Sequence, residues 1–600
     1  GACFAFLILS CPASLSAASS PFDEHLGRIL VEEGLVGAVW AQVSPDLSVA
    51  IGAAGIKDAR TGEALGPEDR VNVGSIAKTV LATGVLRLVS LGRLSLDTPV
   101  SAILPDTLID NRWATSDPVR VRHLLDHTSG LDDLRLWQIF SLKADADTTL
   151  KRAFAGDALL RVRSRPGTRF SYSNMGYTLL GRIVEAVSGE RYERYLDANL
   201  LAPLGMTDST FGFVSQEGPQ ADPRLAMGHF EDRRTQAAVP TFLRPAGQFT
   251  TSAVDMGRFA RFLMSDGRVN GTPFIDPRWL RSMGTPHETE AALGGLGVGY
   301  GLGLFTRDRN GVVGRCHGGS VVGYRAMLCL FPEQQRAYFW SVNTDSETAD
   351  HNRLDQLFVD TLGIAAAEPV KSVGVSEGLE DWNGTYVPAP NRMASFRWLD
   401  TLFNFIRVRR EGSALRIAPL QSQASLLVPV SSLLFRATDR AIASHALLTA
   451  ADGTRVISTG TQTFAQIAPW RLVLLWASLV AGGVGLVWLL LSGLSRAVAR
   501  YLDSTHPVAI PLIGILMLLL PLPFFWSQSF LQIGDLTWAS GLLAIVTALL
   551  PLAMIVGLVM HFRRRTHGAM AMVDSLAMVA VVQLSLVLAI SGLLPLRLWT

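Results

Sequence analysis

The sequence predicts an α+β chain in three parts: a globular part with mixed helices and strands, a small all-β part, and a membrane region of four helices. Residues up to about 465 carry charges throughout, whereas the remainder is mostly apolar and makes the mean hydropathy of the whole chain positive. Inside the charged part, the pattern changes after Ala367-Glu368-Pro369 to short alternating runs separated by turn residues. Six hundred residues also exceed the length of a single domain.

The chain starts with an apolar run, Cys3 to Leu9, which is followed by the small residues Ser16-Ala17-Ala18. This pattern is typical of a secretory signal, here residues 1–18 and truncated because its basic start is missing, with cleavage expected after Ala18. Two alternatives stay open. Ile8-Leu9-Ser10-Cys11 loosely resembles a lipoprotein cleavage site, and the run could instead be a buried first strand or helix.

The stretch 71–78 is extended at first and turns into a helix at or just before Ser75. Ser75 and Lys78 are three residues apart, so a helix places both side chains on one face. A serine hydroxyl is a weak nucleophile until a base takes its proton, and a lysine can do this when burial or a neighbouring cation lowers its pKa. Ser-x-x-Lys is common by chance, but lysine is rare here: the chain has Lys57, Lys78, Lys143, Lys151 and Lys371 alone.

Two later stretches hold polar side chains of the same kind of chemistry. Tyr172 and Asn174 lie two apart in a loop before a predicted helix at 178–187; the tyrosine can relay protons if its pKa is lowered by lysine, and the asparagine can hold a carbonyl. In the run from His317 to Ser320, Gly318 and Gly319 permit close approach of a ligand to the backbone. Each stretch alone is also compatible with an ordinary loop or turn.

Taken together, the three motifs are more specific, because they come in a fixed order with Tyr172 97 residues after Ser75 and His317 145 residues after Tyr172. The region 22–365 resembles the serine beta-lactamase and penicillin-binding-protein superfamily, in its class C-like branch. The resemblance implies a beta-lactamase/transpeptidase-like fold: an antiparallel sheet flanked by helices, plus a helical lobe, with the site between them. One departure is at His317, where beta-lactamases of this branch usually have Lys-Thr-Gly; the esterase and peptidase members are closer.

The resemblance also implies a role for each site residue. Ser75 attacks an ester or amide, Lys78 takes its proton, and Tyr172 acts as co-base and later as acid. Asn174 positions the acyl side chain, and His317 shapes the site. The N–H groups of Ser75 and Ser320 form the oxyanion hole, and the neighbouring backbone is that of Gly318 and Gly319.

Other classes of function find little support in the sequence. A net charge of +2 without a long basic block predicts no nucleic-acid partner, and the sequence lacks the second histidine of a zinc motif after His287, so we expect no metal and no cofactor. Three alternatives to an esterase or amidase remain: a DD-peptidase or beta-lactamase, an acylated membrane receptor, and a structural membrane protein with an inactive hydrolase domain. The substrate, a small molecule or a peptide, and the oligomeric state stay open. Cys316 and Cys329 could sit on paired strands, which makes a disulfide possible but not implied.

The region 378–468 is predicted to form a small β barrel or sandwich, similar to the lipocalin-like domains appended to many members of this superfamily. Eight short alternating runs, separated by turn residues, carry this prediction. They are 384–386, 403–409, 414–419, 425–430, 433–437, 446–448, 455–457 and 464–467.

Four apolar stretches between 472 and 596 are each long enough to cross a bilayer as a helix: 472–494, 508–526, 536–560 and 575–596. The connections 495–506 and 562–574 carry arginine, whereas 527–535 carries neither lysine nor arginine. The positive-inside rule then predicts a multi-pass protein of the bacterial inner membrane, with the hydrolase on the periplasmic or extracellular side. The spans hold almost no ionisable residue, and Gln583 is the polar exception, which favours an anchor over a transporter.

Overall fold

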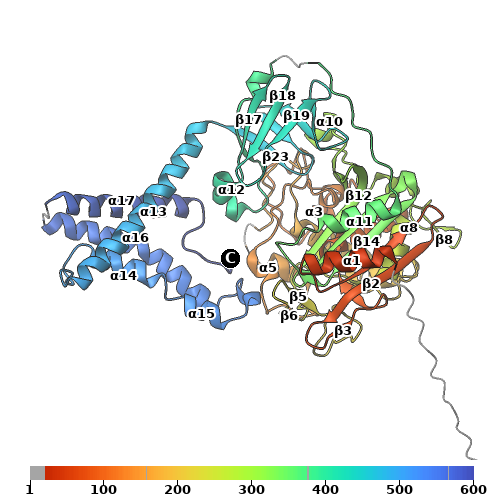
Figure 1. The fold of residues 1–600 in the computed structure, drawn as a ribbon, viewed down its shortest axis with the longest axis horizontal. Coiled ribbons are helices and arrows are strands. Elements are labelled where there is room, and N and C mark those ends of the chain that lie inside the picture. Colours follow the sequence, from red (N-terminus) through yellow and green to blue (C-terminus); the bar gives the residue numbers. More distant parts are fainter. Residues whose placement is uncertain (1–19, 157–158, 375–377, 565–566) are drawn as a thin grey trace, which may run out of the picture.

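The computed structural model describes residues 20–156, 159–374, 378–564 and 567–600. The expected secretory signal lies outside these residues. Figure 1 shows three bodies: a globular N-terminal region over residues 20–365, a barrel beside it, and a helical bundle that extends to one side.

The N-terminal region is built on an eight-stranded sheet in the order β10-β11-β12-β13-β14-β1-β2-β3, with antiparallel neighbours throughout. Helices cover both faces, so β1 is buried almost completely. Its side chains alternate between the two layers: Trp40 packs in the cluster that includes α1 and α11, and Val39 packs in the larger cluster that includes α2 and α8. The strands are β1 (Gly37–Val43), β2 (Val49–Asp58), β3 (Glu63–Ala64), β10 (Gly299–Gly301), β11 (Leu304–Arg309), β12 (Val312–Val321), β13 (Tyr324–Phe331) and β14 (Arg336–Val342).

A helical lobe packs against one face of this sheet, and the Ser75 helix α2 is buried at its centre. The helices of the region are α1 (Pro21–Glu32), α2 (Ala77–Ser90), α3 (Val100–Ile103), α4 (Val121–Leu125), α5 (Leu136–Ile139), α6 (Asn174–Ser188), α7 (Tyr192–Leu196), α8 (Ala253–Leu263), α9 (Pro277–Ser282), α10 (Glu290–Leu293) and α11 (Asn352–Leu362). The short strands outside the main sheet are β4 (Arg70–Asn72), β5 (Gly228–Phe230), β6 (Thr235–Gln236), β7 (Thr250–Ser252), β8 (Arg268–Val269), β9 (Thr272–Pro273) and β15 (Thr344–Asp345).

Two details differ from the sequence-based prediction or complete it. The sequence pattern of residues 300–305 predicts a single strand, but this run forms a tight hairpin between β10 and β11, because Leu302 and Gly303 both adopt positive φ, at 46° and 98°. Cys316 and Cys329 are register partners on β12 and β13 and form a disulfide, which the sequence left open.

The barrel is closed by eight strands, which fits the predicted all-β character of this region. Its strands are β16 (Gly384–Pro388), β17 (Ile406–Glu411), β18 (Ala414–Pro419), β19 (Ser425–Pro429), β20 (Leu434–Ala437), β21 (His445–Thr449), β22 (Arg455–Ser458) and β23 (Thr463–Ile467). The sequence did not predict α12 (Arg397–Phe403), which lies between β16 and β17 and takes Phe403 out of the expected strand. The connection between β16 and α12 leads away from the barrel and contacts the N-terminal region.

Within the described residues, four helices or helix pairs are long and apolar enough to cross a membrane: Pro469–Val498, Ala509–Ser527, Trp538–Arg564 and Ala569–Ile590. They correspond to α13 (Pro469–Val498), α14 (Ala509–Met517) with α15 (Leu522–Ser527), α16 (Trp538–Arg564) and α17 (Ala569–Ile590). The fourth helix starts earlier than predicted, so Asp574 belongs to it and not to the preceding connection. Asp574 is buried and forms an ion pair of 2.8 Å with Arg496 of α13, a charged contact inside the bundle that the sequence-based prediction missed.

Candidate active site

Ser75 lies on the turn that joins strand β4 to helix α2, directly beside strand β12 of the main sheet. Two glycines make this contact possible. Gly74 has a φ of 53°, and a Cβ there would lie 2.7 Å from the backbone of Ser320. A Cβ on Gly319 would lie 1.8 Å from the carbonyl oxygen of Val73. Gly319 therefore allows two backbone segments to meet, and it brings the backbone of β12 against Ser75. Gly318 has only an ordinary contact with Met327, and the close approach of a ligand to these glycines stays a prediction.

The hydroxyl of Ser75 is the point where two other predicted residues meet. Lys78 Nζ lies 2.9 Å from Ser75 Oγ, and Tyr172 donates a hydrogen bond of 3.0 Å to the same oxygen. Lys78 also donates to the carbonyl oxygen of Ala246 at 2.5 Å. Burial lowers the pKa of Lys78 to about 7, so a large fraction of the amine is neutral at neutral pH and can accept a proton from Ser75.

Tyr172 differs from the expectation in one respect. The sequence-based hypothesis lets lysine lower the pKa of this tyrosine, but burial raises that pKa above its ordinary value. The phenol therefore stays protonated at neutral pH and is suited to donate a proton. Its ring lies against His127, with ring centroids 4.2 Å apart, and His127 accepts a hydrogen bond of 3.0 Å from the backbone N–H of Ser173. His127 thus fixes the loop that carries Tyr172, a role that no sequence motif indicated.

Asn174 begins helix α6, earlier than the predicted helix start at 178, because Ser173 caps the helix by accepting from the N–H of Gly176. The buried carboxylate of Asp133 accepts from both the backbone N–H and the side-chain amide of Asn174, at 2.8 and 2.6 Å. These bonds fix the orientation of the Asn174 amide at the cavity wall. No sequence motif indicated Asp133, which comes into contact with Asn174 only in the folded chain.

His317 is fully buried on β12, and burial together with Lys78 lowers its pKa to about 3. The imidazole is therefore neutral. Its Nδ1 lies 2.7 Å from the carbonyl oxygen of Gly318, which can only accept, so Nδ1 carries the proton and Nε2 accepts from Tyr300 OH at 3.2 Å. His317 thus supports the wall of the site through Tyr300, and its described contacts do not include Tyr172.

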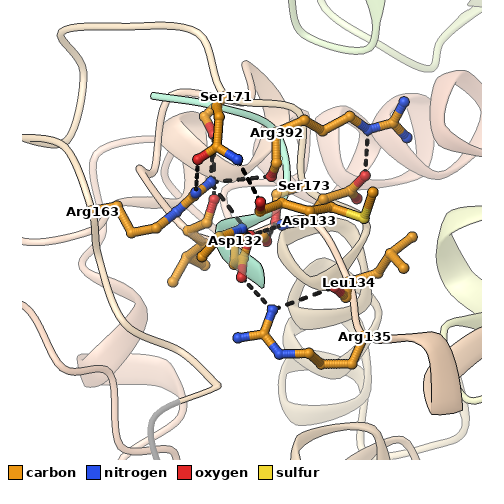
Figure 2. Close-up of polar contacts among 12 residues, drawn as sticks. Asp132, Asp133, Leu134, Arg135, Arg163, Ser171, Ser173 and Arg392 are labelled. Atoms are coloured by element: carbon orange, nitrogen blue, oxygen red, sulfur yellow. Dashed lines mark hydrogen bonds and ion pairs between the residues drawn. The ribbon is translucent and has the colours of Figure 1, made fainter. Parts of the chain in front are cut away.

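Arg392 is the site residue that the sequence-based prediction missed entirely. It lies on the connection between β16 and α12 of the barrel, and its Nε donates to Asp133 at 2.5 Å (Figure 2). Its guanidinium carbon lies 4.8 Å from the centre of the Tyr172 ring. The side chain is 60% exposed because it faces the cavity. Two bonds hold the backbone of the connection: Arg163 donates to the carbonyl of Arg392, and the N–H of Ala394 donates to Asp132.

Eight of the residues described above line one cavity of about 800 Å³. Lys78 is buried beneath it, and no group of three or more potential metal ligands occurs in the part of the chain that the structure describes. The predicted and newly found residues on its wall are Ser75, Tyr172, Asn174, His317, Gly318, Gly319, Ser320 and Arg392.

This fold, with a serine, a lysine and a tyrosine meeting at one hydroxyl, defines a serine hydrolase of the beta-lactamase-like class. The family model described as Beta-lactamase matches residues 22–361, more than half of the chain, and the chain belongs to this family. The chain is 30% identical over 333 residues to "Penicillin-binding protein 4" of Amycolatopsis lactamdurans, which is 52% of this chain and 83% of that protein.

It is also 34% identical over 215 residues to "Esterase EstB" of Burkholderia gladioli, which is 34% of this chain and 54% of the esterase. Among solved structures, the structure of SurE with D-Leu matches 74% of this chain and 98% of its own, with a TM-score of 0.50 and 21% identity. That likeness concerns the fold alone.

Proposed function

We propose that this chain is a membrane-anchored extracytoplasmic serine hydrolase that cleaves an ester or an amide through an acyl-enzyme on Ser75. One observation carries the proposal: Ser75 Oγ lies within hydrogen-bond distance of both Lys78 Nζ and Tyr172 OH, and the pKa of that lysine is lowered to about 7. A buried neutral amine beside a hydroxyl is the arrangement that nucleophilic catalysis by serine needs. The likeness to an esterase supports the same class of reaction.

The geometry gives each group a step. Neutral Lys78 takes the proton of Ser75, whose oxygen then forms a bond to the substrate carbonyl carbon. The negative charge on the carbonyl oxygen is stabilised by backbone N–H groups, for which Ser75 and Ser320 are the proposed donors. The bond to the leaving group breaks as Tyr172, which burial keeps protonated, gives that group a proton. Tyr172, now a phenolate, takes a proton from water as the water oxygen bonds to the acyl carbon. The bond between Ser75 Oγ and the acyl group breaks as Lys78 returns its proton to Oγ, which restores the free enzyme.

A second candidate, a DD-peptidase or beta-lactamase, is favoured by the position of Arg392 at the cavity. His317 is neutral and cannot replace the lysine that usually binds a substrate carboxylate in beta-lactamases of this branch. Arg392, however, brings a guanidinium to the same cavity from the barrel, and a guanidinium binds carboxylates well. The likeness to a penicillin-binding protein is compatible with this candidate.

Covalent labelling with a fluorophosphonate, followed by hydrolysis assays, tests the proposal. The parent chain should be labelled, and Ser75→Ala should abolish both labelling and turnover, whereas the control Ser116→Ala, an exposed serine of the same region, should retain both. Assays with esters, D-amino-acid amides and nitrocefin then separate the two candidates. A chain that the fluorophosphonate labels, but that never releases the acyl group of an ester or amide substrate, would favour the receptor alternative. An acyl adduct on Ser75→Ala would disprove the assignment of the nucleophile.

A further inference from the structure

The connection between α15 and α16 links the membrane region directly to the hydrolase. Asp535 is buried there and accepts hydrogen bonds from Ser141 Oγ at 2.6 Å and from the N–H of Leu142 at 3.2 Å. The N–H of Gly534 donates to the carbonyl oxygen of Phe140 at 2.9 Å. These bonds hold the connection on the segment that follows α5.

The packing at this contact is close. A Cβ on Gly534 would lie 2.4 Å from the backbone nitrogen of Trp137, so the two backbones meet without room for a side chain. Next to it, the ring of Phe530 packs edge-on against Phe140, with centroids 6.3 Å apart, and against Phe230, with centroids 5.4 Å apart. Close packing together with backbone hydrogen bonds and a buried carboxylate is characteristic of a stable interface between two parts of a fold.

Leu531 of this connection lines the cavity that contains Ser75, and its side chain is only 4% exposed. Three residues of the helical lobe, Leu134, Ile139 and Phe140, line the same cavity. The connection therefore adds to an apolar wall of the active site, and an apolar wall binds hydrocarbon groups in preference to charged or strongly polar ones.

Tryptophans mark the level of this wall relative to a bilayer. Trp526 ends the second span and Trp538 begins the third, and they are 83% and 79% exposed; Trp470, at the start of the first span, is 59% exposed. Exposed tryptophans at helix ends are typical of the membrane–water interface. Figure 1 shows α15 at the end of the bundle that meets the hydrolase near α5. The apolar wall thus begins at the surface of the leaflet nearest the hydrolase.

We infer that the substrate is an amphiphile with a long apolar acyl chain, which enters the cavity past Leu531 from that leaflet. The inference rests on the proposed hydrolase function and names its substrate class. The membrane region then contributes to substrate binding in addition to anchoring the chain. Ser75 cleaves the ester or amide at the head of the chain, by the steps given above, while the apolar wall holds the tail.

The test uses the full chain in nanodiscs and p-nitrophenyl acetate, octanoate and laurate as probes. The parent should prefer octanoate to acetate in kcat/KM. Leu531→Trp places a larger side chain at the apolar wall and fills part of the cavity. It should lower the octanoate-to-acetate ratio of kcat/KM about tenfold or more, which is the scale for a few methylenes in a hydrophobic pocket. Leu531→Ala enlarges the cavity at this wall and should shift the substrate preference toward laurate. Leu536→Trp changes an exposed leucine of the same connection and should leave all ratios at the parental value.

Gly534→Val provides an independent variant, because it separates the connection from Trp137 and should also lower the octanoate-to-acetate ratio. Fluorophosphonate labelling of Ser75 reports on the fold of each variant. If Leu531→Trp is no longer labelled, the chain-length preference of Leu531→Ala decides whether the inference holds. A parent that prefers acetate, or labelled Leu531 variants with a parental chain-length profile, would overturn the inference while the hydrolase proposal stands. A parent that is neither labelled nor active with any ester or amide would instead disprove the proposed function, and this inference with it.

Discussion

At the scale of single residues, the site depends on the burial of Lys78. The protein interior disfavours the charged amine, and this lowers the pKa of Lys78 into the physiological range. The same burial raises the pKa of Tyr172, so the two groups that touch Ser75 Oγ differ in protonation at neutral pH. One of them is suited to accept a proton and the other to donate one, a division that suits a general base and a general acid.

Lys78→Ala should therefore lower kcat/KM for esters about a hundred- to ten-thousand-fold, the typical contribution of a general base. In the parent, kcat/KM should rise with pH and level off above about 7, where Lys78 is neutral, and this rise should be absent in the variant. The control Lys151→Ala removes an exposed lysine and should keep the parental pH profile.

Stability gives a second readout for Lys78. Its folded pKa is about 7, below the ordinary value of 10.5, so between these limits the unfolded chain binds more protons and the free energy of unfolding rises with pH. Part of this rise should disappear in Lys78→Ala. A variant that melts far below the parent at pH 7 would instead assign Lys78 a structural role.

At the scale of elements, the active site is assembled from segments that are far apart in the chain. Five residues of the site could be predicted because each belongs to a short motif whose chemistry is recognisable without the fold. They are Ser75, Lys78, Tyr172, Asn174 and His317. The structure brings them to one cavity. Three other residues at the site belong to no such motif: Asp133, Arg392 and Leu531. Their positions depend on contacts between loops, which no local pattern of the sequence indicates. The all-β character and the apolar spans followed from periodicity, whereas α12 and the β10–β11 hairpin depend on local turns.

The connection from β16 to α12 yields a prediction at this scale. Arg392→Gln keeps a donor near Asp133 but removes the charge that faces the cavity. For a substrate with a free carboxylate, such as nitrocefin, kcat/KM should fall about ten- to a hundredfold, the scale of one charge-assisted hydrogen bond. A neutral p-nitrophenyl ester should be affected much less.

The control for this prediction is Arg397→Gln, which removes an exposed arginine of α12. It should leave the ratio between the two substrates unchanged. Equal losses on nitrocefin and on the neutral ester in Arg392→Gln would mean that Arg392 positions Tyr172 and Asp133 without binding a carboxylate.

At the scale of the whole molecule, the bundle has two different ends. The end that meets the hydrolase carries the exposed tryptophans and the connection with Leu531. Helices α13 and α16 both end at the far end, where Arg500 follows α13 and Arg564 is the last residue of α16. Between these ends, Arg496 and Asp574 form a buried ion pair that joins α13 to α17. The bundle is thus polarised along its length, in the way that the positive-inside rule associates with a fixed orientation.

Reporter fusions test this orientation. A reporter that works only in the cytoplasm should be active in the connections after α13 and after α16, and inactive after Thr600. A reporter that works only outside the cytoplasm should show the opposite pattern. The two connections serve as controls for each other, since α13 and α16 both end at the far end of the bundle. The reverse result would place the hydrolase in the cytoplasm and contradict the proposed localisation.

The contact of Gly534 with Trp137 also bears on how the protein is made. Synthesis runs from the N-terminus, so the hydrolase region leaves the ribosome long before residues 528–535 exist, and domains generally fold as units in that order. Ser75 and Lys78 can meet at that stage, but the cavity still lacks the wall that Leu531 supplies. The wall is added only when the second and third spans are in place. With the proposed membrane insertion and substrate class, maturation of the substrate cavity would be coupled to insertion of the spans. A hydrolase released from its bundle would then keep its nucleophile but lose part of its selectivity.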